Sequence, residues 1–174
     1  MRVRALPVVL VALMLSGSAP AAHADGKPFQ LALFTPIQIF NEKESITGLR
    51  LNLIYGRNVN VTGVDLGLVN HNTGDGGGIQ WGAVNYVQKD FIGWQASYVN
   101  ITEAKFTGFQ YGFYNQDSEG NGVMVGFVNS TKAMHGLQIG FLNLTDTMHG
   151  LQIGLGNIIK EGGIPFLPIV NWRF

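Results

Sequence analysis

The sequence has no cysteine and few charged residues. Because none of its 174 residues is a cysteine, an exported form of the protein must fold without disulfide bonds. Lys, Arg, Asp and Glu make up 13% of the chain, about half of the ~25% usual in soluble domains. After the N-terminal segment, no run reaches the ~18 apolar residues of a transmembrane helix. We therefore expect neither a disulfide-held domain nor a helical membrane protein.

The charge balance argues against a nucleic-acid-binding protein. The eleven Lys and Arg equal the eleven Asp and Glu, but Arg2 and Arg4 fall in a segment that we expect to be removed. The rest then has nine basic and eleven acidic residues, a net charge of −2. Nucleic-acid-binding domains instead show a concentrated basic surface. We expect no nucleic-acid partner, and no pattern predicts a cofactor.

The first 24 residues have the features of a secretory signal peptide. Two arginines give a positive start, Val8 to Leu15 is an apolar run, and Ala22-His23-Ala24 matches a signal-peptidase site. Cleavage before Asp25 leaves residues 25–174 as one domain, large enough for a single core. No cysteine follows the apolar run, so a lipoprotein anchor is excluded. The sequence predicts export.

A short phrase, opened by glycine and closed by asparagine, repeats over residues 48–163. It is clearest in GLQIGFLN from Gly136 and GLQIGLGN from Gly150. The opening glycines, spaced by fifteen residues four times and then by fourteen three times, are Gly48, Gly63, Gly78, Gly93, Gly108, Gly122, Gly136 and Gly150. The closing asparagines are Asn70, Asn85, Asn100, Asn115, Asn129, Asn143 and Asn157, with Tyr55 in this place in the first repeat. A fixed period indicates one structural unit used repeatedly.

Each repeat has the pattern of a β-strand with one apolar face. With the opening glycine numbered 0, positions +1, +3 and +5 are apolar in all eight repeats, as in Leu137, Ile139 and Phe141. This period of two is typical of a strand. Short turn segments such as Asp117-Ser118-Glu119 separate the strands. The pattern predicts an all-β fold.

The opposite face of each strand is small and polar. Position +4 is glycine in six repeats, and position +2 is polar in seven. The polar +2 residues, to which we assign a structural role, are Arg50, Asp65, Gln80, Gln95, Gln110, Gln138 and Gln152. Arg50 and Asp65 hold this position in consecutive repeats, and we expect them to pair inside the fold, where each removes the cost of burying the other alone.

Two architectures fit this repeat. In a β-solenoid each repeat is one coil of 14–15 residues, and in an antiparallel up-and-down meander each repeat is one strand and one turn. The solenoid explains the recurring asparagine as an internal ladder. However, a solenoid coil needs a second wall of inward residues, and the segment His71 to Gly77 has no apolar side chain. We favour the meander.

Such a meander is expected to close into a barrel of about ten strands, an even number as in bacterial outer-membrane barrels. Phe29 to Phe40 would add a strand before the eight repeats, and residues 164–174 would add one after them. The apolar face would contact lipid and the polar face would line the lumen. Arginine at Ile139 should then block assembly, whereas arginine at Gln138 should be tolerated better.

The C-terminus resembles the last strand of outer-membrane β-barrels, which typically ends in phenylalanine. Val170, Trp172 and Phe174 alternate on one face. We assign Trp172 and Phe174 a structural role in barrel closure and in recognition by the insertion machinery. Pro168 departs from the pattern, because proline cannot donate a hydrogen bond within a ladder.

The GLQIG-x-x-N phrase also resembles the repeats of an uncharacterised group of bacterial surface-repeat proteins, first labelled in leptospires. The resemblance covers roughly residues 48–174. It implies a location in the cell envelope, and it implies no catalytic residues.

Few residues are arranged for chemistry. His135 and His149 precede opening glycines in adjacent repeats, but no third ligand recurs with them, and we predict no metal site. The segment TGDGGG from Thr73 lacks the lysine and the helix of a phosphate loop. His71, Asp75 and Asp117 have no spacing that indicates a catalytic set.

We therefore expect an exported outer-membrane or cell-surface protein with a structural, adhesive or narrow-pore role. Outer-membrane lipid and the insertion machinery are its expected partners. The alternative is a secreted soluble β-solenoid that binds a partner or a glycan through its flat repeated face. A rim-active outer-membrane hydrolase is a second alternative, although the sequence predicts no enzyme.

Overall fold

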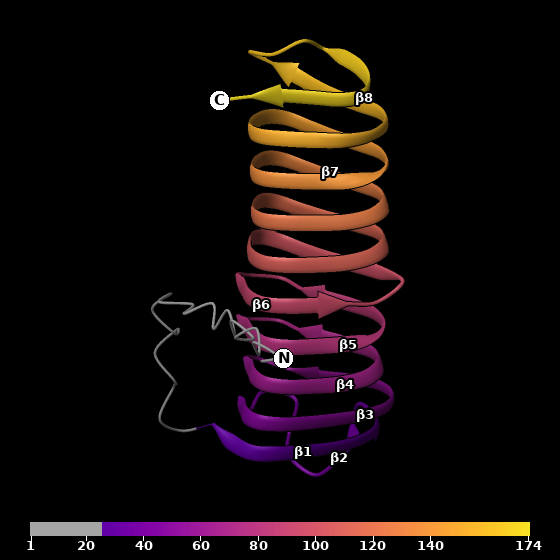
Figure 1. The fold of residues 1–174 in the computed structure, drawn as a ribbon. Coiled ribbons are helices and arrows are strands. Elements are labelled where there is room, and N and C mark those ends of the chain that lie inside the picture. The colour runs from indigo at the N-terminus through magenta and orange to yellow at the C-terminus, as the bar shows by residue number, and fades with distance from the viewer. Residues whose placement is uncertain (1–25) are drawn as a thin grey trace, which may run out of the picture.

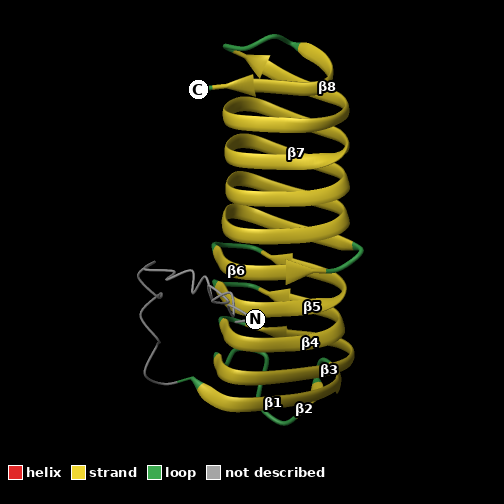
Figure 2. Cartoon of the chain, in the orientation of Figure 1, coloured by secondary structure: helices red, strands yellow, loops and turns green. Residues whose placement is uncertain are grey.

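The computed structural model describes residues 26–174, which form a β-solenoid of stacked coils (Figure 1). The predicted signal peptide, residues 1–24, lies outside the described residues. Strands and connecting loops account for the whole described part, as Figure 2 shows. The strands are β1 Lys27–Phe34, β2 Ile37–Gln38, β3 Ile46–Asn58, β4 Val61–Asn72, β5 Gly76–Val87, β6 Phe91–Ala96, β7 Val99–Glu161 and β8 Phe166–Arg173. No helix long or apolar enough to cross a membrane occurs in residues 26–174.

Successive repeats pair in parallel, so the predicted antiparallel meander and its ten-stranded barrel are wrong. Opening glycine faces opening glycine, as in Gly48 with Gly63 and Gly93 with Gly108. The 63 residues of β7 continue through several coils without a break in the ladder. The 14–15-residue coil, which was the alternative interpretation, is the observed architecture.

The opening glycines are required where neighbouring coils come closest. Gly136 has a φ of +133°, a region that side chains other than glycine rarely adopt. A Cβ atom there would lie 2.1 Å from the carbonyl oxygen of Gly122 in the preceding coil. The same combination of positive φ and close approach recurs at all eight opening glycines. Glycine therefore keeps the repeats in register.

Side-chain amides supply much of the second wall, for which the linker segments offer few apolar side chains. Each closing asparagine is buried and donates a hydrogen bond to the next, as in Asn115 to Asn129 and Asn129 to Asn143, both at 2.8 Å. The second N–H of Asn129 reaches the carbonyl oxygen of Ile139 at 3.0 Å. Because each of these amides donates to the next coil and accepts from the one before, the asparagine ladder allows a largely polar interior. Requiring an apolar second wall was the error that favoured the meander.

Apolar side chains fill the corner between the end of one repeat and the start of the next. Two buried clusters occupy it, and one of them also includes Met124 from position +2. Their members are Met124, Met134, Met148 and Ile159 in one, and Val87, Phe91 and Phe106 in the other. The interior therefore has an apolar corner and polar ladders side by side.

The two ends depart from the repeat. The strand expected over Phe29 to Phe40 is divided into β1 and β2 at Thr35 and Pro36, and β2 folds back antiparallel on β1. At the other end, β8 pairs antiparallel with the last coil of β7, with Trp172 opposite Leu151. Each reversal covers part of a coil edge that would otherwise be free to pair with another chain. Trp172 therefore belongs to an end strand, which Phe174 directly follows, and neither residue closes a barrel.

In the first repeat, Tyr55 does not occupy the closing position that the sequence pattern assigned to it. β3 contains one extra residue between Asn52 and Tyr55, so that Gly56 rather than Tyr55 faces Asn70. The side chain of Asn52 takes the ladder position and donates to Asn70 at 2.9 Å. The asparagine ladder is therefore complete from the first repeat onward.

Candidate functional site

One wall of the solenoid is apolar and faces outward. It consists of the side chains at positions +1, +3 and +5 of the eight repeats, and we call it the apolar wall. Its most exposed members include Trp81 at 60%, Tyr98 at 74% and Phe113 at 59%. The outward direction follows from strand alternation, because the +2 side chains between them point into the core. The sequence predicted this division of faces, and the structure places it on a solenoid.

No outward side chain on this side of the coil is Lys, Arg, Asp or Glu. Positions −1 to +6 contain no Lys, Arg, Asp or Glu in six of the eight repeats. The two exceptions, Arg50 and Asp65, point inward and are buried. The charged side chains of the repeats that remain at or near the surface all lie on the later part of the coil, for example Lys105 with Glu119 and Lys160 with Asp146. Each coil therefore has one side without exposed charges and another side that carries them.

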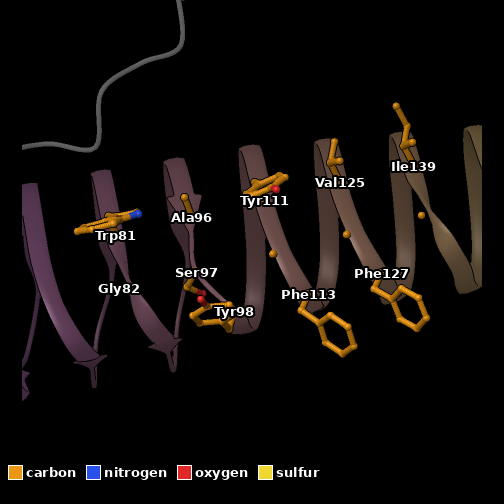
Figure 3. A pocket seen from close by; sticks show the side chains of 13 residues that line it. Trp81, Gly82, Ala96, Ser97, Tyr98, Tyr111, Phe113, Val125, Phe127 and Ile139 are labelled. Carbon is orange, nitrogen blue, oxygen red and sulfur yellow. The ribbon is translucent and has the colours of Figure 1, made fainter.

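A groove runs along the apolar wall, parallel to the axis of the solenoid (Figure 3). The +3 side chains Trp81 and Tyr111 line one bank, and the +5 side chains Phe113 and Phe127 line the other. Small residues at +4 form its floor, and its volume is about 690 Å³. The groove exists because +3 and +5 point outward while the residue between them has almost no side chain.

The glycines of the floor are fixed by the coils beneath them. A Cβ atom at Gly140 would lie 2.4 Å from the carbonyl oxygen of Gly126 and 2.7 Å from the side-chain nitrogen of Asn129. The phenylalanines of the adjacent bank stack, with ring centres 4.9 Å apart for Phe113 and Phe127 and 4.7 Å for Phe127 and Phe141. The groove is thus a rigid feature whose floor is set by the asparagine ladder.

The polar +2 side chains form a second ladder inside the fold. Gln95 donates to Gln80 at 2.7 Å, and Gln110 donates to Gln95 at 2.9 Å. Gln152 donates to Gln138 at 2.8 Å in the later coils. The structural role assigned to these glutamines is consistent with their complete burial.

The ladder begins at an ion pair between Arg50 and Asp65, the two residues expected to meet. Two parallel hydrogen bonds of 2.7 Å join the guanidinium to the carboxylate. Their side chains are 0% and 4% exposed. Asn72 accepts a further N–H of Arg50 at 2.6 Å, and Gln80 donates to Asp65 at 2.8 Å. Bidentate geometry and these additional partners compensate for the cost of burying both charges.

Met124 interrupts the glutamine ladder. It occupies the +2 position after Gln110, and its thioether has no N–H to donate, so Oε1 of Gln110 is buried without a hydrogen-bond partner. Asp117, which is 3% exposed, accepts from Gln110 at 3.1 Å, but its Oδ2 also lacks a partner. Burial raises the pKa of Asp117 from 3.8 to about 7. This buried carboxyl was not identified as special from the sequence, because its burial depends on how the coils stack.

The residues considered for catalysis are separated in the fold. Nδ1 of His71 lies 2.7 Å from the hydroxyl of Tyr55, and burial together with Arg57 and Arg50 lowers the pKa of His71. Asp117 lies three coils further along, about 14 Å away at ~4.8 Å per coil, and Asp75 sits in an exposed turn. His135 and His149 are brought side by side, with ring centres 5.8 Å apart. The structure therefore brings the two histidines together, whereas it separates His71, Asp75 and Asp117.

No family model, curated protein or solved structure matches this chain.

Proposed function

We propose that the protein is an exported, non-enzymatic component of the bacterial cell envelope that lies on a lipid surface through its apolar wall. The observation that supports this proposal most directly is the charge distribution. The wall presents apolar side chains in every coil and no Lys, Arg, Asp or Glu, while the exposed charges of the repeats lie on the remaining sides. Such a two-sided surface suits the boundary between water and hydrocarbon.

The dimensions of the wall are sufficient for this role. Eight coils at ~4.8 Å and four residue steps at ~3.3 Å give a face of about 38 by 13 Å, or roughly 500 Å². At ~25 cal/mol per Å², transfer of this face out of water corresponds to about 12 kcal/mol before the costs of immobilisation. A flat, rigid scaffold gains this contact without an ordering cost in the backbone.

The aromatic residues of the wall favour a membrane interface over a purely apolar contact. Trp81, Trp94, Tyr98 and Tyr111 combine large apolar rings with a polar N–H or O–H group. Such residues are enriched at the level of lipid headgroups. The resemblance to bacterial surface-repeat proteins and the predicted signal peptide support an envelope location. The proposal includes no pore, because the ladder side chains fill the interior.

Vesicle flotation with paired arginine variants tests the proposal. The exported chain should float with neutral phosphatidylcholine vesicles, and high salt should not release it because no charge pairing is involved. Phe127→Arg, which places a charge on the wall, should abolish flotation. Ser130→Arg is the matched control, since it changes an outward residue of the same repeat outside the wall.

Three outcomes would contradict the proposal. Equal flotation of the Phe127→Arg and Ser130→Arg variants would show that the wall is not the contact. Release of the wild-type chain by high salt would indicate an electrostatic contact elsewhere. Formation of a discrete dimer that does not float, and that Phe127→Arg dissociates, would assign the wall to a second copy of the chain instead of lipid.

A further inference from the structure

His135 and His149 lie next to each other on adjacent coils, away from the apolar wall's groove. Both occupy position −1, point outward and are exposed. Their ring centres are 5.8 Å apart, with an angle of 43° between the ring planes. They line a shallow hollow of about 310 Å³ together with Thr147, Arg173 and Phe174.

This separation is close to what two imidazoles need to share one metal ion. With a Zn–N bond of about 2.0–2.1 Å and ~1 Å from a ring nitrogen to its ring centre, each centre lies ~3 Å from the metal. A tetrahedral angle between the two ligands then places the ring centres about 5 Å apart. Small rotations of two exposed side chains cover the difference from the observed distance. The parallel coils hold the two backbones at a fixed spacing, so little ordering is required.

We propose that His135 and His149 form a binding site for one divalent transition-metal ion of the Cu²⁺, Ni²⁺ or Zn²⁺ class. Imidazole nitrogen is a preferred ligand of these ions, whereas Mg²⁺ and Ca²⁺ prefer oxygen. Within residues 26–174 no three His, Cys, Asp or Glu side chains converge as a metal site. Water or a ligand from outside the chain therefore completes the coordination.

The surroundings of the pair limit its affinity and orient one ring. The Phe174 ring meets the His149 ring edge to face at 6.3 Å. Arg173 also lines the hollow, and its guanidinium donates to the carbonyl oxygen of Glu161 at 3.0 Å. A nearby positive charge opposes a cation, so the expected site is weaker than a closed site with four protein ligands.

Duplication of the repeat explains why two histidines exist, and the coil geometry explains what they can do. Met-His-Gly occurs at Met134 and again at Met148. The other six repeats have no histidine at position −1: the residues there are Thr47, Thr62, Gly77, Ile92, Thr107 and Asn121. Asn121 lies one coil before His135 in the same column. It therefore offers a position where an imidazole can be placed beside His135 without altering the fold.

Titration calorimetry of the exported chain, purified without a histidine tag, tests this site with Ni²⁺, Cu²⁺, Zn²⁺ and Mg²⁺. We expect one ion per chain, the tightest binding for Cu²⁺ and none for Mg²⁺. His135→Ala and His149→Ala should each weaken binding by about tenfold or more, since even loss of a group that only orients a ligand costs that much. His71→Ala is the control and should bind as the wild type does.

The Asn121→His variant separates this site from incidental binding to a surface histidine. In the His149→Ala background it places an imidazole one coil before His135, at the spacing of the original pair, and should restore Cu²⁺ or Ni²⁺ binding that His149→Ala had weakened by about tenfold or more. Circular dichroism should show the same β-structure for all variants, because every substituted side chain in the −1 column points outward. Wild-type affinity in both single alanine variants, or no recovery of binding when Asn121→His is added to His149→Ala, would overturn the proposal.

Discussion

Replacing Asp117 with asparagine should remove a pH-dependent cost from the folded state. Burial raises the pKa of the Asp117 carboxyl to about 7 from its ordinary 3.8, and hydrogen bonds from Gln110 and Thr102 offset only part of this effect. Between these two pKa values the folded protein holds a proton that the unfolded chain has lost. Stability therefore falls as the pH rises from about 4 to about 7, and it stays level above that range.

The magnitude follows from the difference between the two pKa values. About three pKa units at 1.36 kcal/mol each give a cost of about 4 kcal/mol when both states are ionised. Asparagine has almost the same shape, carries no charge at any pH, and adds an N–H beside the unpaired acceptor of Gln110. Asp117→Asn should therefore increase the free energy of unfolding by up to about 4 kcal/mol at pH 8 and by less than about 1 kcal/mol at pH 4.

Urea unfolding of the wild-type chain and the variant at both pH values measures this difference. The matched control is Asp65→Asn, which also replaces a buried aspartate but removes the partner of Arg50. That variant should lose about 3–5 kcal/mol at pH 8, because an uncompensated guanidinium stays buried. If Asp117→Asn shows the same pH profile as the wild-type chain, or is less stable than it at pH 8, then the buried Asp117 carboxyl does not carry the expected pH-dependent cost.

Four further substitutions test the fold. Gln138→Arg should prevent folding because Gln138 is buried in the ladder, whereas Ile139→Arg should fold, and circular dichroism and solubility measure both. The barrel interpretation predicted the reverse order. Equal folding of the two variants would contradict the solenoid. Gly136→Ala should lower the free energy of unfolding by several kcal/mol, on the order of the 1–3 kcal/mol of a strained backbone plus a steric clash; an unchanged urea midpoint would show that the coils can separate there. Met124→Gln should stabilise the chain by about 1 kcal/mol by giving Gln110 a donor, and a loss larger than that in the same assay would mean that the methionine cluster matters more than the ladder.

The strands and their two faces could be predicted from the sequence because they depend on neighbouring residues only. Alternation alone assigns Leu137, Ile139 and Phe141 to one face and Gln138 to the other. The direction of pairing is not a local property. It depends on whether the segment after each strand can form a wall, and an asparagine such as Asn143 forms one only when the same residue stands above and below it.

The details of the site depend on how coils stack, and single repeats do not contain them. The groove arises because a Cβ atom at Gly140 would meet the coil beneath it. The raised pKa of Asp117 arises because stacking of the coils buries this carboxyl. The pairing of Arg50 with Asp65 was predictable, since it needs only the same position in two consecutive repeats, and either pairing direction would place them on neighbouring strands.

Quenching of tryptophan fluorescence by brominated lipid tests the central claim most directly. The chain has three tryptophans, and all three are exposed. Trp81 and Trp94 belong to the apolar wall, and Trp172 lies opposite Leu151 on the same side. If the wall lies on lipid, vesicles with bromine on the upper acyl chain should quench the emission and shift it to the blue, and Phe127→Arg should remove both effects. Unchanged emission in the presence of vesicles that bind the protein would contradict the account.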